Sequence, residues 1–242
     1  MIFREFRNFI DRWVERLGNT RERTALRHLR GHGIEIGALH NPLWVPSWAK
    51  VTFVDRMSEA DLRRQYPELR DLDLIDPDVV DDGETLKTFA DGSQDFIIAN
   101  HFLEHTEDPI GTIRRHVAVL RRGGKLYLAV PDKHYTFDRD RPVTDYEHLV
   151  RDHREGPGWS RIGHFREYVE KVTKVTDPAQ IEAEVAHLDG MNYSIHFHVW
   201  TGPSLKSFLE RAIADFAIPA TLVSIVENPS HGEHVCVLRK SR

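Results

Sequence analysis

Cysteine, long apolar runs and excess positive charge are all scarce in this sequence. Its 242 residues include a single cysteine, Cys236, which excludes an internal disulfide and is typical of a reducing compartment. No stretch approaches the ~20 apolar residues of a membrane-spanning helix, and charged residues stand where a signal peptide needs its apolar region. We therefore expect a cytoplasmic protein without a spanning segment.

The charge and composition limit the partners and the number of domains. A formal net charge of -5 at pH 7 gives no basic field for a polyanion, so nucleic acid is not an expected partner. Hydrophobic residues make up 40% of the chain, which is enough for one sizeable α/β core but leaves little room for a second domain. We predict a single domain over residues 1–242; nothing in the sequence indicates its oligomeric state.

The stretch 33–42, G-I-E-I-G-A-L-H-N-P, reads as a strand containing Glu35 that runs into a loop of small residues, Gly37 and Ala38. Backbone amides of such a loop can approach a ligand closely, because no side chain obstructs them. A second apolar strand ends at Asp55, about 20 residues on, where nucleotide-binding folds place a carboxylate for the ribose hydroxyls. The pattern therefore predicts a nucleoside site.

Helix and strand patterns alternate along most of the chain, which predicts a parallel sheet with helices on both faces. The predicted helices are 2–17, 21–31, 58–70 (interrupted by Pro67), 109–121 and 203–214, and the further strands are 79–80, 95–99, 125–130, 221–226 and 234–238. The last two strands suggest a hairpin around residues 228–232. Residues 1–30 form an N-terminal helical extension, 31–131 the ligand-binding core and 201–242 the C-terminal helix and hairpin.

Two segments stand apart from this alternation. The helix over 2–17 sets aromatic residues opposite arginines, so it is expected either to pack over the domain or to touch a membrane surface. Residues 132–200 are polar and rich in histidine, arginine and aromatic residues, which predicts an ordered lid of loops and short helices above the site. The lid offers hydrogen-bonding groups for a polyhydroxylated or anionic acceptor: His134, Tyr135, Arg139, Arg141, His148, Arg161 and His164.

Five motifs in order resemble those of the class I S-adenosylmethionine-dependent methyltransferases. They are E-I-G-A from Glu35, V-T-F-V-D up to Asp55, D-V-V-D-D-G at 78–83, S-Q-D-F-I-I-A-N-H-F-L-E-H-T-E-D-P at 93–109 and L-R-R-G-G-K-L-Y-L-A-V-P at 120–131. The resemblance implies a Rossmann-like seven-stranded sheet and S-adenosylmethionine as the cofactor. It also implies the cofactor-binding residues Glu35, Gly37, Ala38, Asp55, Arg56, Asp82, Gly83 and Asn100, with Asp82 accepting from the adenine amino group.

Transfer of a methyl group to a hydroxyl requires that the hydroxyl lose its proton, and a histidine with a pKa near 6.5 is a natural base. His105 matches the histidine of the L-E-H-x-x-D-P motif in related small-molecule methyltransferases, and it follows the fourth strand. Some relatives hold a divalent ion at this place, and His101 stands where they carry a carboxylate; a metal is the less favoured alternative. We name His105, His101 and Asp132 as candidate catalytic residues.

The acceptor is suggested only by resemblance. The runs P-D-K-H-Y-T-F-D-R-D-R-P, S-R-I-G-H-F and H-F-H-V-W-T are similar to those of a methyltransferase subgroup associated with surface-polysaccharide assembly, which implies O-methylation of a sugar or glycan intermediate. Two alternatives remain: a nicotinamide-dependent sugar dehydrogenase or epimerase, although G-x-G-x-x-G is absent after the first strand, and a relative that binds the cofactor without catalysis.

Two histidine patterns admit a metal. Residues 101–105 spell H-x-x-E-H, but this zinc-peptidase signature needs a helix that the neighbouring strand and Asp108-Pro109 leave no room for. His196 and His198 on an extended run would point to the same side, as a metal pair or substrate contact or simply as solvated side chains.

Overall fold

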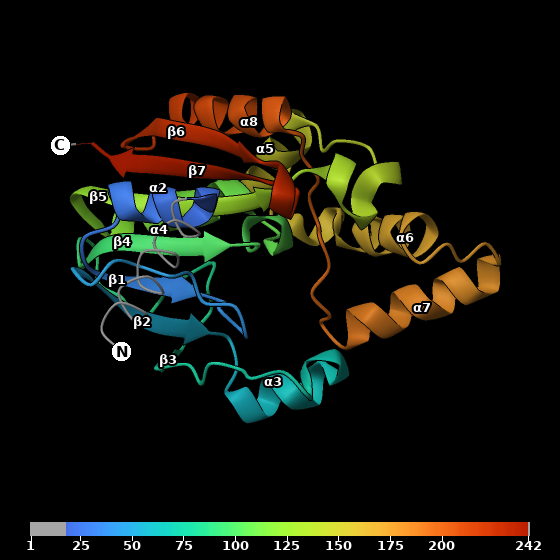
Figure 1. Cartoon of the computed structure of the whole chain (residues 1–242). Coiled ribbons are helices and arrows are strands. Elements are labelled where there is room, and N and C mark those ends of the chain that lie inside the picture. The colour runs from blue at the N-terminus through green and yellow to red at the C-terminus, as the bar shows by residue number, and fades with distance from the viewer. Residues whose placement is uncertain (1–17, 242) are drawn as a thin grey trace.

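The computed structural model describes residues 18–241, whose centre is one seven-stranded sheet (Figure 1). Its strands, in the order β3-β2-β1-β4-β5-β7-β6, are β1 (Gly31–Ile36), β2 (Ala49–Asp55), β3 (Val79–Val80), β4 (Gln94–Asn100), β5 (Leu120–Pro131), β6 (Ala220–Asn228) and β7 (Glu233–Lys240). β1 to β5 run parallel, whereas β7 is antiparallel to both β5 and β6. The predicted Rossmann-like sheet and its C-terminal hairpin are confirmed; the helix predicted over 2–17 lies outside the described residues.

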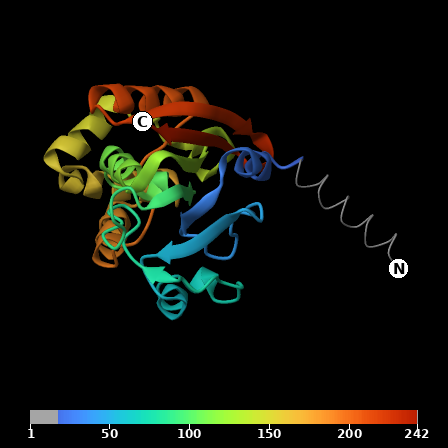
Figure 2. The same cartoon turned by 90° about the vertical axis from the view of Figure 1, so that its left-hand side faces the viewer.

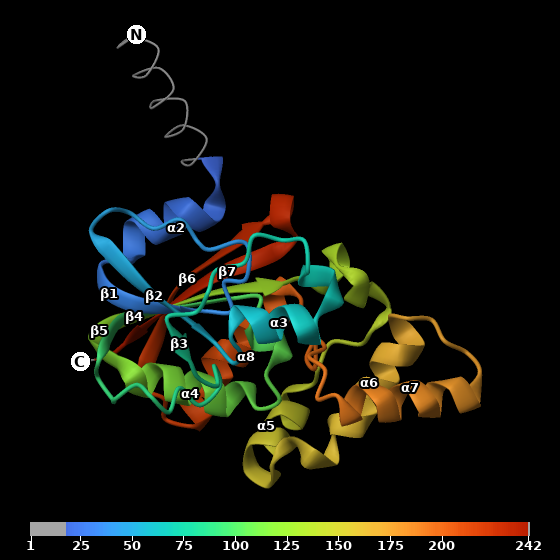
Figure 3. The same ribbon diagram turned by 90° about the horizontal axis from the view of Figure 1, so that it is seen from below.

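Helices cover both faces of the sheet, as predicted. One face packs against α4 (Pro109–Val119), α5 (Tyr146–Glu155) and α8 (Gly202–Asp215), while α2 (Thr20–His28) lies across the other (Figure 3). Alternation along β4 explains this, because Ile97 and Ala99 enter the first core and Phe96 and Ile98 the second. A strand buried on both faces reads as a continuous apolar run, which is how β4 appears in the sequence.

Residues 37–48, which connect β1 to β2, contain no helix. The loop covers the sheet with Leu43 and Val45, and the carboxylate of Glu35 accepts the backbone N–H of Leu43 at 2.9 Å. The small-residue loop inferred from Gly37 and Ala38 is therefore longer than a tight turn. Gly37 itself has a φ of 64°, in the left-handed region where an L side chain is strained.

Two predicted helix ends are wrong. The helix predicted over 21–31 ends at His28, and Gly31 already opens β1. The helix that begins at Pro109, capped by Asp108 as expected, ends at Val119 and not at residue 121. Residues 121–124 belong to β5, because Leu120 already pairs with Gln94 and a register irregularity precedes the next pairs. Gly123, with a φ of 78°, turns the backbone within this irregular start of the strand.

The lid is more regular than the expected loops and short helices. Besides α5 it contains α6 (Arg161–Lys171) and α7 (Pro178–Gly190), while α3 (Glu59–Gln65) faces it from the core across the mouth of the sheet (Figure 1). Ile181, Val185 and Leu188 lie on one side of α7 and pack with Phe165 and other residues of α6 in a separate small core. These three apolar residues are separated by polar and small residues in the sequence, so the helix was not recognised there.

The described part of the chain begins with α2, which lies next to β5, β6 and β7, and ends directly after β7 (Figure 2). Among the helices of residues 18–241, none combines the length and apolar character needed to cross a membrane.

Separate parts of the lid are joined to one another through the buried guanidinium of Arg141. It donates to the carboxylates of Asp138 at 2.8 Å and Glu167 at 2.6 Å, and to the carbonyl oxygens of His196 at 2.7 Å and Phe197 at 3.3 Å. Arg141 is 1% exposed, so the guanidinium and the equally buried Asp138 compensate each other's charge.

We predict that Arg141→Met lowers the free energy of unfolding by about 3–5 kcal/mol, because Asp138 then stays buried without its partner. Urea denaturation measures the effect. The matched control is Arg166→Met, which removes an exposed pair with Glu182 and should change stability little. Equal effects of the two substitutions would contradict the role given to Arg141.

Candidate active site

A cavity of about 620 Å³ opens at the carboxyl ends of β1 to β4. β1 and β4 are neighbours in the sheet. The chain leaves β1 toward the edge that carries β3, and it leaves β4 toward the edge that carries β6. The loops that follow the two strands therefore diverge and leave a crevice between them. Strand-end loops supply one wall, including Gly37, Asp55 and His101. α3, its following turn and residues 192–197 of the lid supply the opposite wall.

Seven of the eleven predicted site residues line this cavity, and the fold collects them from four strand ends. They are Gly37, Asp55, Arg56, Asp82, Gly83, His101 and His105. Glu35, Ala38, Asn100 and Asp132 are not among its lining residues. None of the seven lid residues expected to contact an acceptor lines it either.

Glu35 and Asn100 lie next to the cavity wall. Glu35 is 1% exposed and holds the backbone N–H of Leu43; burial raises the pKa of its carboxyl to about 7. It braces the loop that carries Gly37. Asn100 ends β4, and neither its amide nitrogen nor its oxygen has a hydrogen-bond partner within residues 18–241, which is costly for a buried amide.

Asp132, one of the three residues predicted to be catalytic, has its carboxylate hydrogen-bonded within the framework. Its carboxylate accepts from the backbone and ring of His134, at 2.9 and 2.8 Å, from the backbone N–H of Gly202 at 3.1 Å and from His234 Nε2 at 3.0 Å. These bonds fasten the start of the lid to α8 and β7. With its oxygens so occupied and no access to the cavity, Asp132 has no free oxygen for a substrate.

The strand-end carboxylates occupy the side of the cavity where the nucleoside was expected. Burial raises the pKa of Asp55, against the opposing effect of the backbone amides of Met57 and Arg56. Asp82 accepts from the backbone N–H of Glu84 at 2.9 Å, and from Thr85 Oγ1 at 3.0 Å, so it also shapes its turn.

Gly83 is required for close packing at this end. A β-carbon there would lie 2.6 Å from a methyl group of Ile36 and 2.7 Å from the ring of Phe102. Both neighbours line the cavity, so a larger residue at position 83 would push its wall inward or outward.

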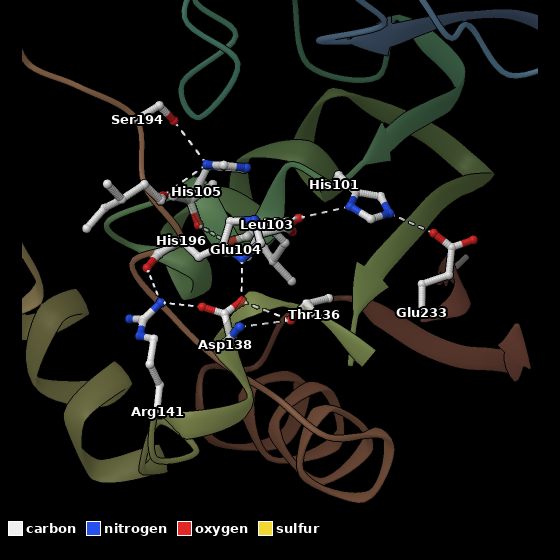
Figure 4. A network of polar contacts seen from close by, with 12 residues as sticks. His101, Leu103, Glu104, His105, Thr136, Asp138, Arg141, Ser194, His196 and Glu233 are labelled. Atoms are coloured by element: carbon white, nitrogen blue, oxygen red, sulfur yellow. Dashed lines mark hydrogen bonds and ion pairs between the residues drawn. The ribbon is translucent and has the colours of Figure 1, made fainter. Parts of the chain in front are cut away.

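His101 lies between two buried carboxylates (Figure 4). Its Nε2 is 2.7 Å from Glu233 and its Nδ1 is 3.6 Å from Glu104. Burial lowers the pKa of His101, but the hydrogen bond to Glu233 and the charges of Glu104 and Glu233 outweigh it and raise the pKa above the ordinary value. A φ of 47° is a strained backbone conformation for a histidine, which is common at functional sites.

Glu233 was not foreseen from the sequence. It is fully buried and also accepts from Arg21 Nε at 2.7 Å and from Asn228 Nδ2 at 2.6 Å. These donors, with His101, overcome the effect of burial and lower its pKa to about 2. Arg21, His101 and Glu233 come from α2, the end of β4 and β7, and no local pattern connects them.

His105 offers a free nitrogen lone pair (Figure 4). Its Nδ1 lies 2.9 Å from the carbonyl oxygen of Ile195 and 3.0 Å from Ser194 Oγ. Because a carbonyl oxygen only accepts, Nδ1 carries the proton and Nε2 does not. Burial lowers the pKa of His105 to about 3, so the expectation of a value near 6.5 is wrong. The side chain is a neutral hydrogen-bond acceptor at physiological pH.

Glu104 is a buried carboxylate beside His105. It is fully buried, neither oxygen has a hydrogen-bond partner among the described residues, and burial raises its pKa. His196 Nε2 lies 3.9 Å from it, and His196 Nδ1 lies 2.6 Å from Asp138. One ligand atom each of Glu104, His105 and His196 lies within 4.8 Å of the others, so these three residues could hold a cation at the cavity wall.

The structure separates the two histidines that were expected to point to the same side. His196 belongs to the group around Glu104, whereas His198 lies with His148, Asp152 and His164. The alternation rule fails because residues 194–200 are not a strand. The zinc-peptidase interpretation of residues 101–105 is also excluded, since His101 has a left-handed backbone and Leu103–His105 is a single 3-10 turn.

A protein-family model described as a methyltransferase domain matches residues 3–212 of this chain. No curated protein sequence gives a match.

Solved structures with a similar fold include a protein from Pyrococcus horikoshii, with 15% identity, a TM-score of 0.50 and coverage of 95% of this chain and 91% of that one. A Rhodobacter sphaeroides protein described as a candidate zinc-dependent alcohol dehydrogenase has 15% identity, a TM-score of 0.50 and coverage of 89% and 86%. An S-adenosylmethionine-dependent methyltransferase from Methanosarcina mazei has 18% identity, a TM-score of 0.46 and coverage of 90% and 96%. At these identities the similarity concerns the fold and not the activity.

We predict that Glu233→Gln destabilises the protein at neutral pH and that the difference disappears in acid. A folded-state pKa of about 2, against an ordinary 4.5, corresponds to about 3 kcal/mol of stabilisation. Because the folded pKa is depressed, this stabilisation is present above pH 4.5 and is lost as the pH falls through 2. Urea unfolding of both proteins between pH 2 and 7 measures it; a difference that does not change with pH would contradict the ion-pair account.

Proposed function

The chain belongs to the methyltransferase domain family, and we propose that this S-adenosylmethionine-dependent methyltransferase methylates a hydroxyl group of a sugar or glycan intermediate. One observation carries the proposal: a cavity that has strand-end cofactor residues on one wall and polar and aromatic lid residues on the other. S-adenosylmethionine supplies the methyl group, and the protein has to bind it, place the acceptor hydroxyl in line and accept or direct the hydroxyl proton.

The cofactor wall fits a nucleoside. Asp55 ends β2 as a half-buried carboxylate, suited to a pair of ribose hydroxyls. Asp82 and Gly83 follow β3, where the family resemblance expects the adenine. Gly37 has open space where a β-carbon would lie, so the backbone of this loop can approach a ligand. Asp82 still has acceptor capacity, since a carboxylate has about four lone-pair sites and two are used.

The acceptor wall favours a neutral polyhydroxylated molecule over an anionic one. Besides Asp55 and Asp82, the carboxyl groups of Glu68, Glu84 and Glu107 line the cavity, against a single arginine, Arg56. Carboxylates accept hydrogen bonds from sugar hydroxyls and repel anions. The tilted rings of Tyr66 and Tyr193, 5.5 Å apart at their centroids, add apolar faces with hydroxyl groups at their edges.

His105 is proposed to receive the acceptor hydroxyl. Its Nε2 has no proton and its ring is fixed by the bond from Nδ1 to Ile195. An imidazole with a pKa of about 3 is a poor base in the ligand-free cavity, so its first role is to orient the hydroxyl and to take up the proton as the methyl group departs from the sulfonium. The second proposal, that His105 acts as a ligand of a divalent ion, uses Glu104 and His196 as its partners.

We predict that Asp55→Asn weakens the binding of S-adenosylhomocysteine by roughly 10- to 100-fold, because a charge-assisted hydrogen bond is worth about 1.5–3 kcal/mol. Calorimetry with the wild type and the variant measures the affinity. The control is Asp95→Asn, which lies near the N-terminal end of β4, away from the cavity at the carboxyl ends of the strands. NADH is titrated in parallel. Binding of NADH instead of S-adenosylhomocysteine by the wild type would reject the proposed function.

We predict that His105→Ala leaves the affinity for S-adenosylhomocysteine unchanged and lowers methyl transfer to the acceptor by roughly 10²- to 10⁴-fold. Between pH 5 and 8 the turnover of the wild type should show no pH dependence from the titration of His105, because this side chain becomes protonated, and so inactive, only as the pH falls toward about 3.

Chelation distinguishes the two roles. If His105 holds an ion, chelation of the wild type reproduces the loss and added magnesium or manganese restores activity; if it acts alone, added magnesium or manganese does not change the rate of methyl transfer. Full turnover of a folded His105→Ala enzyme would reject both roles.

A further inference from the structure

A second group of metal-ligating side chains lies inside the lid, away from the walls of the cavity. His148 and Asp152 stand one turn apart on α5, His164 lies on α6, and His198 belongs to the segment 194–200. None of the four lines the cavity. Three parts of the chain, separated by as many as 50 residues of sequence, thus bring three imidazoles and one carboxylate to a single point.

The four ligand atoms have the spacing of a coordination site. His148 Nε2 lies 3.0 Å from His164 Nε2 and 3.2 Å from Asp152 Oδ2, and Asp152 Oδ2 lies 3.7 Å from His198 Nε2. All four atoms are within 4.8 Å of one another. A tetrahedral ion with bonds of about 2.0–2.1 Å holds its donor atoms about 3.3–3.4 Å apart, so small shifts would seat one here.

Hydrogen bonding alone leaves this group unsatisfied. Asp152 is 1% exposed and its Oδ1 accepts from Ser160 Oγ at 2.7 Å, but Oδ2 has no hydrogen-bond partner among the described residues. The same oxygen is the one that faces the ring nitrogens. A buried carboxylate oxygen without a donor is expensive, and a cation between the four groups removes that cost.

Burial favours the neutral form of two of the three histidines, His164 and His198, and only neutral imidazoles bind metal. Burial lowers the pKa of His164 to about 4, and burial with the neighbouring histidines lowers that of His198 well below its usual value. Neutral imidazoles present lone pairs. Arg141, whose charge acts on His164 and His198, is already paired with Asp138 and Glu167, so it does not supply the missing positive charge.

We propose that His148, Asp152, His164 and His198 bind one divalent cation of the zinc class in a closed tetrahedral site that stabilises the lid. Three nitrogens and one carboxylate oxygen suit Zn²⁺ better than Mg²⁺ or Ca²⁺, which prefer oxygen ligands. Four protein ligands leave no open position, so the ion is structural and not catalytic. The second-sphere bond from Ser160 to Asp152 orients the carboxylate.

The location gives the ion a defined task. His198 is next to Phe197, and Ser194 and Phe197 line the cavity. A cation that joins α5, α6 and His198 therefore fixes the segment that forms the acceptor wall. The proposal does not depend on which molecule occupies that wall.

Elemental analysis of the purified full-length protein, followed by chelation and titration with zinc alone, tests the proposal. We expect about one zinc per chain, a melting temperature lowered on the order of 10 °C by chelation, and recovery with zinc but not with magnesium. Cobalt added to the chelated protein should give the intense absorption of a tetrahedral ion. Wild-type protein that takes up neither zinc nor cobalt after chelation would overturn the proposal without any variant.

Variants locate the ion. His164→Gln and Asp152→Asn should lose zinc, whereas His187→Gln, an exposed histidine on α7, should retain it. His196→Gln separates this site from the group around Glu104: zinc that is retained in His164→Gln and lost in His196→Gln belongs to that other group and refutes the proposal. Should either variant of the site fail to fold in zinc-free medium, the wild-type metal content and the cobalt spectrum decide.

Discussion

The path of residues 194–200 is the constraint on which the site depends. This segment has no regular secondary structure, yet its backbone is bonded to three separate parts of the chain: Phe197 N–H to Glu104, the carbonyl oxygen of His196 to Arg141, and Val199 N–H to Thr144. A buried backbone without helix or strand must find such partners. With these bonds formed, Ser194 Oγ lies next to the ring of His105, and His198 lies beside His148, Asp152 and His164 in the lid.

This arrangement buries several charged side chains, some within the lid and others at the strand ends. Arg141 and Glu233 have full sets of partners, and each holds elements far apart in sequence. Glu104 and Asp152 instead have carboxylate oxygens without donors. Arg141 joins parts of the lid to one another, and Glu233 joins α2, the end of β4 and β7. The two unsatisfied carboxylates mark where a protein of this fold gives up stability, which is typical of binding sites. One adjoins the cavity and the other lies within the lid.

The strand-end wall of the cavity could be predicted from the sequence because each of its residues lies at or just after the end of a strand. A parallel sheet brings all carboxyl strand ends to one edge, so Gly37, Asp55 and Asp82 were placed by strand order alone. The acceptor side could not be predicted in this way. Glu68 and Tyr193 reach the cavity from α3's following turn and from the lid, and Asp132, although it ends a strand, is occupied by His234 and Gly202.

By itself, the sequence determined the fold class, the positions of the strands along the chain and the residues at or just after the ends of β1 to β4, since local periodicity and chain connectivity are enough for these. Only the tertiary structure decided which histidines act together. His101 forms a hydrogen bond with Glu233, which lies 132 residues further along the chain. His196 and His198 belong to different groups of side chains, although they are only two positions apart in the sequence. Long-range packing sets these neighbours, and with them the burial and charge that move the pKa of His105 far from its ordinary value.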